Sequence, residues 1–213
     1  MVEAMRLAST PLMVAHTLRF DRALRGFRAY LPSVGALRSL AVTLTVPGRS
    51  RLPGNPGFLG RGPLLDLGVH VLDLVRWLTG AEVRQVLCRL DPADPSRMEE
   101  TAEVELTLGT GCQCVLHVGW RGTERIGSAT AEGDQGRATV DWRARTLAYT
   151  SLSGSIVQQS FDETATILET LEGFLTAVLK GTPMPVSALD ALEAVRLVDA
   201  CYESARRRRP LDV

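Results

Sequence analysis

Two side chains that can exchange protons stand four residues apart in an otherwise apolar stretch of this sequence. They are Asp66 and His70, within residues 62–80, which read GPLLDLGVHVLDLVRWLTG. In a helix, a spacing of four places two side chains on one face. A histidine titrates near neutral pH, and a neighbouring carboxylate can orient its ring and stabilise its charged form, so the pair suits proton transfer. On spacing alone, the commoner arrangement is a buried Asp–His hydrogen bond that only holds the helix in place.

The remaining titratable residues narrow the chemistry. Asp73 lies three residues after His70, on an adjoining part of the same face. The other two histidines, His16 and His117, are far away in sequence, so the pattern excludes a zinc site of the HExxH kind. Only one of the 24 basic residues is a lysine, Lys180. Because arginine keeps its proton in proteins, a mechanism that needs a catalytic lysine must use Lys180 or borrow one from another chain.

The residues around the pair predict a helix that is buried on most sides. Pro63 suits the first helical position, where a missing N–H costs nothing. Gly80 suits the residue just past the end of the helix. Between them, apolar residues occupy nearly every direction around the axis. A carboxylate and an imidazole in such a helix are costly to bury without partners, so they indicate either an internal pair or a polar site that opens onto a cleft.

This stretch resembles the signature helix of the glucose-fructose oxidoreductase / inositol dehydrogenase (Gfo/Idh/MocA) family. That pattern is a glycine-rich lead-in, then Leu-(Leu)-Asp-x-Gly-x-His-x-x-Asp, then Trp-Leu-x-Gly. Residues 11–24, PLMVAHTLRFDRAL, are similar to the strand that leaves the family's dinucleotide-binding domain. Residues 186–213 resemble the family's closing helix and the short apolar end that follows it. The resemblance covers essentially the whole chain, but only the second half of the family's length.

The resemblance implies roles for individual residues. In the family, a Lys from a Glu-Lys-Pro motif of the dinucleotide-binding fold works with an Asp and a His from the second half. Asp66 and His70 match those two positions, so they are the expected catalytic pair, and His70 would exchange a proton with the substrate oxygen. His16 and Arg19 match positions beside the domain junction and are expected to contact substrate. Asp73 matches a position expected to be structural.

The sequence carries no fingerprint for the family's cofactor, NAD(P). It contains no G-x-G-x-x-G and no Walker A motif. The clusters Gly109-x-Gly111 and Gly133-x-x-Gly136 fall between predicted strands, whereas a dinucleotide fingerprint joins a strand to a helix. NAD(P) is therefore implied by the resemblance alone. The cysteine and histidine spacings do not predict a metal site.

These observations predict the substrate-side half of an NAD(P)-dependent sugar or polyol dehydrogenase that cannot transfer hydride on its own. Binding a nicotinamide is the step on which hydride chemistry depends. The alternative is a shortened, non-enzymatic relative that binds a small ligand or serves as an oligomeric scaffold. The expected partners are a carbohydrate or polyol substrate, a second copy of the chain and, in a divided enzyme, a separate dinucleotide-binding chain.

The expected fold is α+β, an open and predominantly antiparallel sheet with helices packed on one face, as in the C-terminal domain of dihydrodipicolinate reductase. Strands that follow one another without intervening helices favour antiparallel pairing. The other face of the sheet is expected to mediate oligomerisation, because a large sheet cannot leave apolar residues in water. Strands are expected at 37–46, 83–90, 103–108, 112–118, 124–132, 137–142, 146–150 and 155–160.

Two domains are expected along the chain. Residues 1–20 would be a remnant of a dinucleotide-binding domain, with the end of a helix at 2–8 and a short buried strand at 11–16. Residues 21–213 would form the substrate-binding and oligomerisation domain. Such a remnant would leave an apolar edge that needs to be covered.

Three helices and one loop complete the expected domain. Asp21 can cap a helix that runs through about Leu31. The loop at 47–61, rich in Gly and Pro, could fold over the cleft as a lid. A helix at 163–179 would have as its core stripe Ile167, Leu168, Leu171, Phe174, Leu175 and Val178. In a final helix, capped by Ser187, the residues expected to face the core are Leu189, Leu192, Val195, Val198 and Tyr202.

Composition and charge indicate a globular cytoplasmic protein. Hydrophobic residues make up 45% and charged residues 23%, and the formal net charge is +0. Such a chain has no long-range field to draw nucleic acid or an anionic membrane. The basic run at 206–209 is typical of a solvated helix end. The absence of a secretory signal and of a membrane-length apolar run leads us to expect reduced thiols in the cytoplasm.

Overall fold

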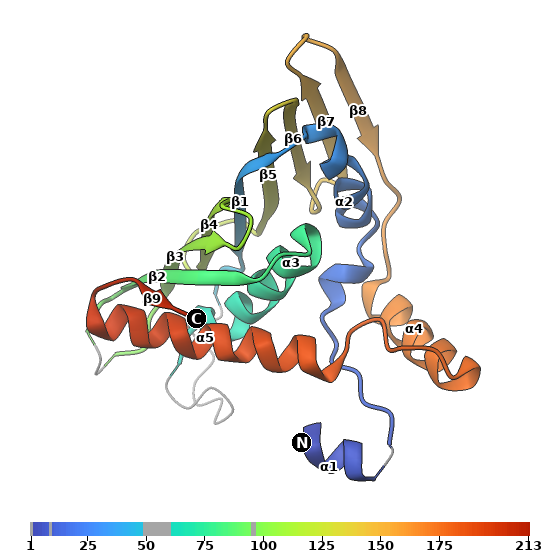
Figure 1. Ribbon diagram of the computed structural model, residues 1–213. Helices are drawn as coiled ribbons and strands as arrows, with labels where there is room; N and C mark the ends of the chain where they lie inside the picture. The colour runs from blue at the N-terminus through green and yellow to red at the C-terminus, as the bar shows by residue number, and fades with distance from the viewer. Residues whose placement is uncertain (1, 9, 49–60, 95–96) are drawn as a thin grey trace.

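A single nine-stranded sheet organises the molecule. The computed structural model describes residues 2–8, 10–48, 61–94 and 97–213 (Figure 1). The strand order is β8-β7-β6-β5-β1-β4-β3-β2-β9. The strands are β1 (Leu37–Thr45), β2 (Val83–Asp91), β3 (Thr101–Leu108), β4 (Gln113–Gly119), β5 (Ile126–Gly133), β6 (Gly136–Asp141), β7 (Thr146–Ser151), β8 (Ile156–Ser160) and β9 (Leu211–Asp212). The expected lid at 47–61 falls largely outside the described residues.

The pairing confirms the predicted antiparallel sheet, with one exception. β1 and β4 run parallel, in the register Leu40 to Cys114 and Val42 to Leu116. Every other neighbouring pair of strands is antiparallel. Because parallel strands end at the same edge, the chain leaves β1 and β4 at adjacent points of the sheet. This edge receives one of the two candidate catalytic side chains.

Helices cover one face of the sheet, as the sequence predicts. α2 packs on β5, β6 and β7, while α5 packs on β2 and against α3 (Figure 1). α4 projects away from the sheet and contacts η1. The helical elements are α1 (Val2–Leu7), η1 (Thr17–Phe20), α2 (Arg22–Val34), η4 (Leu64–Gly68), α3 (Val69–Thr79), α4 (Thr166–Lys180) and α5 (Ala188–Arg207).

Alternation along the strands builds the core beneath these helices. In β3, the buried side chains of Val104 and Leu106 alternate with the polar Glu103 and Glu105. This period of two sends apolar side chains toward the helices and polar ones to the other face. The open face is therefore largely polar, and on β4 it carries the exposed Val115 among polar neighbours. Burial of apolar residues is thus a weak reason for the expected oligomerisation through this face, which stays a prediction.

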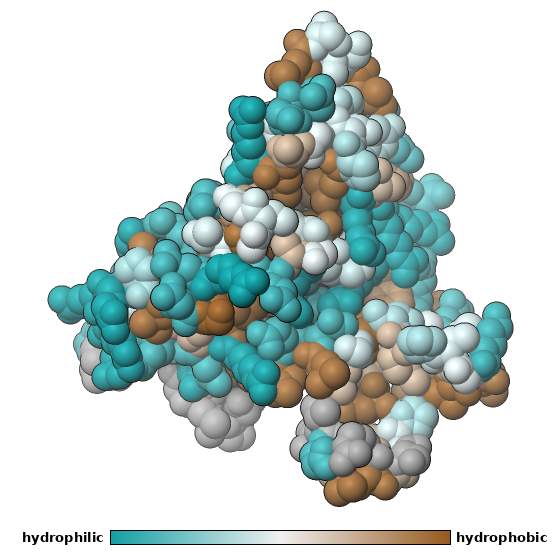
Figure 2. Space-filling model, in the orientation of Figure 1, coloured by the Kyte–Doolittle hydropathy of each residue, from teal (hydrophilic) through white to brown (hydrophobic). Residues whose placement is uncertain are grey.

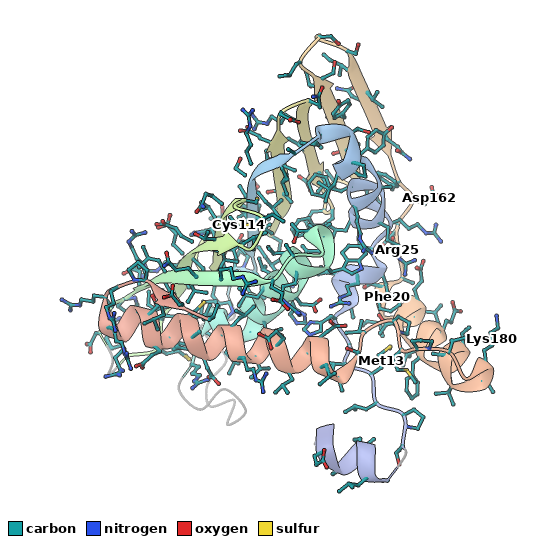
Figure 3. The ribbon with its side chains drawn as sticks, in the orientation of Figure 1. Met13, Phe20, Arg25, Cys114, Asp162 and Lys180 are labelled. Carbon is teal, nitrogen blue, oxygen red and sulfur yellow. The ribbon has the colours of Figure 1, made fainter. Side chains whose placement is uncertain are left out.

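The expected strand at 11–16 is wrong. Met13 forms a single isolated bridge with Ser187 (Met13 is labelled in Figure 3), and no strand is assigned to these residues. The N–H of His16 donates to the carbonyl of Val14 at 2.9 Å, and the chain then enters η1 at Thr17. These local bonds curl the backbone, so it cannot stay extended. The domain division proposed at residue 20 stays a prediction.

The helix after the sheet exists, but its predicted core stripe is wrong. Most of the expected core residues of α4 are exposed, with fractions of 70% for Ile167 and 54% for Leu171. The buried face carries Thr170 and Ala177 instead, and Gly173 lies against the ring of Phe20. Periodicity finds the apolar face of a helix but not what that face meets. α4 therefore turns its small side chains, and not its large ones, toward the rest of the described chain.

The stripe predicted for the final helix is only partly right. Ser187 caps α5 in a capping box with Asp190, as expected for an N-cap, and Val198 is buried. Leu189 and Val195, however, are exposed by 66% and 42%. The buried stripe consists of Ala191, Ala194, Leu197, Val198, Cys201 and Ser204. The helix therefore packs on a stripe that is rich in small side chains, while Leu189 faces water.

Candidate functional site

The candidate helix opens with a π-helical turn that the sequence does not predict. η4 (Leu64–Gly68) leads directly into α3 (Val69–Thr79), and Gly80 ends the helix with a left-handed φ of 65°. Asp66 lies in the π turn and His70 in the first turn of α3. π-helical turns are rare and occur frequently at functional sites. The predicted single helix is therefore two elements, and the candidate pair spans their junction.

A buried carboxylate anchors the start of this helix. Oε1 of Glu99 accepts hydrogen bonds from the backbone N–H of Gly62 at 2.8 Å, the N–H of Leu64 at 3.3 Å and the hydroxyl of Tyr202 at 2.6 Å. Burial, together with the hydrogen bond to Glu99, raises the pKa of Tyr202, so the phenol remains a donor. A negative charge at a helix N-terminus satisfies free N–H groups and suits the helix dipole.

The close approach of two backbones explains the glycine at this helix start. A Cβ atom added at Gly62 would lie 2.1 Å from the carbonyl oxygen of Glu99. No side chain fits in that space, so Gly62 is required by packing. Sequence reasoning did not find Glu99, because its partners lie far along the chain and no local motif marks it.

Asp66 reaches the edge of the sheet where β1 and β4 end. Nε1 of Trp120, the residue after β4, donates to Oδ2 of Asp66 at 3.1 Å. Trp120 is buried at 4% exposure, whereas Asp66 is half-buried. The indole therefore holds the carboxylate in one orientation while leaving it access to solvent. Sequence reasoning missed Trp120 as well.

His70 lies against a second, fully buried histidine. The ring centroids of His16 and His70 are 5.5 Å apart, with an interplanar angle of 83°. His16 is 3% exposed, and neither of its ring nitrogens has a hydrogen-bond partner among the described residues. Burial lowers the pKa of His16, although Asp73, 3.8 Å from Nδ1, opposes that shift. His16 is therefore a neutral ring that packs edge-on against the half-buried His70.

Arg19 holds the helices together behind these rings. Its Nε donates to Oδ2 of Asp73 at 2.8 Å, and Nη2 donates to Oδ1 at 2.5 Å. Nη1 reaches Asp190 of α5 at 3.4 Å. Burial opposes the charge on Arg19, but the hydrogen bonds and charge of Asp73 outweigh it and raise the pKa of Arg19. The same arginine therefore joins η1, α3 and α5.

The structure thus places the four predicted site residues in three sets of contacts. His16 meets His70 directly, and Asp66 is held beside the sheet edge by Trp120. Arg19 is 8% exposed and directs its guanidinium to Asp73 and Asp190. Asp73 is 1% exposed, as expected for the structural residue.

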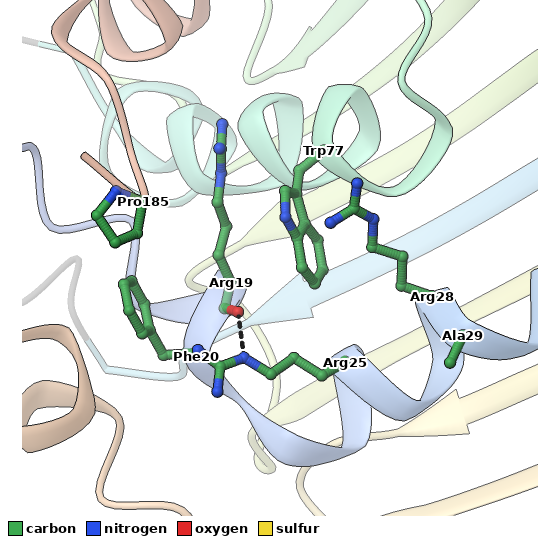
Figure 4. Close-up of a pocket in the computed structure, with 7 residues that line it drawn as sticks. All are labelled: Arg19, Phe20, Arg25, Arg28, Ala29, Trp77 and Pro185. Carbon is green, nitrogen blue, oxygen red and sulfur yellow. Dashed lines mark hydrogen bonds between the residues drawn. The ribbon is translucent and has the colours of Figure 1, made fainter. Parts of the chain in front are cut away.

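A cavity of about 570 Å³ lies beside α3, and neither member of the candidate pair lines it. Its walls come from η1, α2, α3 and the loop before α5 (Figure 4). The lining residues are Arg19, Phe20, Arg25, Arg28, Ala29, Trp77 and Pro185. Arg19 contributes its backbone carbonyl, which accepts from Nε of Arg25 at 3.0 Å. This cavity is therefore separate from the Asp66–His70 pair.

Neither glycine-rich turn of the sheet matches the dinucleotide fingerprint, as the sequence context predicts. The turn at Gly109 and Gly111 joins β3 to antiparallel β4, and the turn from Gly133 to Gly136 joins β5 to antiparallel β6. A pyrophosphate is instead bound where a glycine-rich turn leads from a strand into a helix. Over the same part of the chain, no group of three His, Cys, Asp or Glu gathers to hold a metal ion. Nor is any described helix long and apolar enough to cross a bilayer.

Solved structures with this architecture include two oxidoreductases. An oxidoreductase from Agrobacterium radiobacter, solved with NAD+, L-tartaric acid and magnesium, superposes with a TM-score of 0.82 at 23% identity, covering 99% of this chain and 67% of that one. Aldose-aldose oxidoreductase from Caulobacter crescentus, solved with glycerol, gives a TM-score of 0.82 at 20% identity, covering 100% of this chain and 67% of that one. At these identities the likeness establishes the fold.

The family follows from the sequence match. The GFO/IDH/MocA C-terminal domain family matches residues 33–139, half of the chain. This chain belongs to the Gfo/Idh/MocA family of oxidoreductases. It is 24% identical to D-apiose dehydrogenase from Rhizobium rhizogenes and 25% identical to D-apiose dehydrogenase from Paraburkholderia graminis. The matches cover 100% of this chain and 67% and 62% of those enzymes.

Proposed function

We propose that this domain is the substrate-side half of an NAD(P)-dependent sugar or polyol dehydrogenase and that Asp66 and His70 are its proton-transfer pair. The observation that carries this proposal is that each side chain is held by a buried aromatic neighbour and is itself only half-buried. Trp120 holds the half-buried carboxylate, and the ring of His16 packs against the half-buried imidazole. A fixed pair of groups that still meets solvent is what a substrate hydroxyl requires.

The residues of this chain would handle only the proton. In the oxidising direction, the O–H bond of the substrate breaks and its proton passes to an unprotonated imidazole nitrogen of His70. Asp66 would hydrogen-bond the same hydroxyl or stabilise the imidazolium that forms, because a nearby carboxylate favours the charged ring. His16 acts as a positioning residue, since its buried ring restricts how His70 can turn.

The hydride that leaves the substrate carbon needs an acceptor other than the side chains of this pair. A bound nicotinamide would supply the acceptor for the hydride that leaves the hydroxyl-bearing carbon as its C–O bond becomes C=O. The glycine turns of the sheet lack the strand–turn–helix context in which such a cofactor is bound. We therefore infer that a dinucleotide-binding unit outside these residues supplies the opposite wall of the active site, in the same polypeptide or in another one.

D-Apiose is the first substrate to test, because the two curated relatives are D-apiose dehydrogenases. The chain would be joined behind the dinucleotide-binding domain of the Rhizobium rhizogenes enzyme, and reduction of NAD+ would be followed with D-apiose, D-glucose and glycerol. Removing a general acid–base group costs about 10²–10⁴-fold in rate, so His70→Gln and Asp66→Asn should each lose activity on that scale.

A matched control separates chemistry from general damage. His117→Gln removes the exposed histidine on the open face of the sheet and should leave the rate unchanged. A chimera that binds NAD+ but oxidises none of the three compounds would contradict the proposal. So would a His70→Gln chimera that keeps the full rate.

A further inference from the structure

The cavity beside α3 has a composition that the dehydrogenase proposal does not use. Three of its seven lining residues are arginines, and none of the seven is acidic. Two aromatic rings and a proline make up most of the rest. A cavity of about 570 Å³ lies within the range of small-molecule sites. Figures 3 and 4 place it where η1 meets α2, at the side of the molecule that carries Phe20 and Arg25.

The positive charge of this cavity is only partly neutralised. Arg19 is paired with Asp73 and Asp190, and Arg25 is paired with Glu169 at 3.1 Å. Arg28, by contrast, forms no ion pair with any residue that the structure describes. Its guanidinium instead lies 4.6 Å from the ring centroid of Trp77. One full cationic charge therefore remains available at the cavity wall.

The arginines are also held in place before any ligand arrives. Nε of Arg25 donates to the carbonyl of Arg19, Nη1 donates to Glu169, and its guanidinium lies 5.1 Å from the ring centroid of Phe20. The contact with the ring of Trp77 restricts Arg28 in the same way. A guanidinium presents a planar fork of N–H donors that matches a carboxylate or a phosphate.

Apolar surface lies beside these donors. Phe20 and Trp77 stand on two sides of the hollow, and Pro185 lies next to Phe20 (Figure 4). Phe20 is only 3% exposed, so the half-buried Trp77 supplies most of the open aromatic surface, and a flat ring favours a planar or apolar body. We propose that this cavity binds a small organic anion, whose carboxylate or phosphate meets Arg28 and Arg25 while a ring or apolar body lies against Trp77. This site does not depend on the dehydrogenase proposal.

The indole N–H signal of Trp77 reports directly on the cavity. The chain would be titrated with benzoate, with phenyl phosphate and with neutral benzyl alcohol, and the Trp77 signal would be followed by NMR and assigned with Trp77→Phe. We expect saturable displacement by at least one of the two anions, and the comparison between them tells a carboxylate site from a phosphate site. Benzyl alcohol should bind more weakly, because it lacks the charge.

Two arginine variants test the role of charge. Arg28→Gln should weaken anion binding about tenfold, which corresponds to the loss of one charged hydrogen-bond partner. Arg28 and the control residue Arg38 are both exposed, so neither variant disturbs the core, and Arg38→Gln should bind as the wild type does. The proposal is overturned if neither anion moves the Trp77 signal, if benzyl alcohol binds as tightly, or if Arg28→Gln keeps the wild-type affinity.

Discussion

At the scale of single residues, the candidate site depends on side chains that come from distant parts of the sequence. Trp120 is 54 residues from Asp66, and Glu99 is 37 residues from Gly62. Local spacing identifies Asp66 and His70 but carries no information about what orients them. This is why the sequence yields the pair and its family resemblance but not Trp120 or Glu99, which are found only once the chain is folded.

The buried ring of His16 makes stability depend on pH. Burial lowers the pKa of His16 below 6.5, so the unfolded state binds its proton more readily than the folded state. The contribution of neutral His16 to the free energy of unfolding is therefore complete above pH 6.5 and is lost as the pH falls below that value. By pH 5.5 the loss from this ring is at most about 1.4 kcal/mol.

The test compares urea unfolding at pH 7.5 and pH 5.5 for the wild type and His16→Gln. The groups that face His16 are Asp73, His70, Arg19 and Asp190, and they stay the same in both proteins. We expect the wild type to lose more free energy of unfolding between the two pH values than the variant does. Equal losses in the two proteins would contradict a neutral, buried His16.

Glu99 should be one of the most sensitive positions outside the candidate pair. Glu99→Ala leaves three donors without their acceptor, so we expect a loss of about 2–4 kcal/mol in the free energy of unfolding. Glu99→Gln keeps an acceptor oxygen and should lose about 1 kcal/mol. Both losses would be measured by chemical denaturation. Glu82→Ala, at a side chain that is 78% exposed, is the control and should change the free energy of unfolding by less than about 0.5 kcal/mol. An equal loss in all three variants would contradict the role of Glu99 as the anchor of the helix start.

At the scale of elements, the sequence predicts the strands better than the helix faces. The eight strands expected between residues 37 and 160 all occur within a few residues of their predicted ends, because alternation is imposed by the sheet itself, whereas the strand expected at 11–16 does not form. The stripe of α4 is wrong because a helix with apolar residues on one side gives no sign of what covers that side. The π turn at Leu64–Gly68 is missed because a spacing of four fits an α-helix equally well.

The correction to α4 leads to a direct stability test. Leu171 and Leu175 are 54% and 55% exposed, so Leu171→Gln with Leu175→Gln should change the free energy of unfolding by less than about 0.5 kcal/mol each. Ala177 on the opposite side is 3% exposed, and Ala177→Leu should cost about 1–3 kcal/mol by overpacking. Large losses for the two leucines and none for Ala177 would restore the stripe predicted from the sequence.

At the scale of the whole molecule, two surfaces differ from each other in polarity. The open face of the sheet is mostly polar, whereas exposed apolar side chains gather along α4, at the lower right of Figure 2. Large exposed apolar patches often mark interaction sites. The larger exposed apolar surface of the described residues is therefore on α4, and oligomerisation through the sheet face stays a prediction.

The most direct test of the central claim is an NMR titration of this chain with D-apiose, in which the ring signals of the three histidines are followed separately. If the Asp66–His70 pair binds the sugar, the His70 signals shift in a saturable way, those of His16 follow by contact, and those of exposed His117 stay in place. Asp66→Asn should weaken the response. A sugar that binds without moving His70, or that shifts His117 by the same amount, would contradict the account.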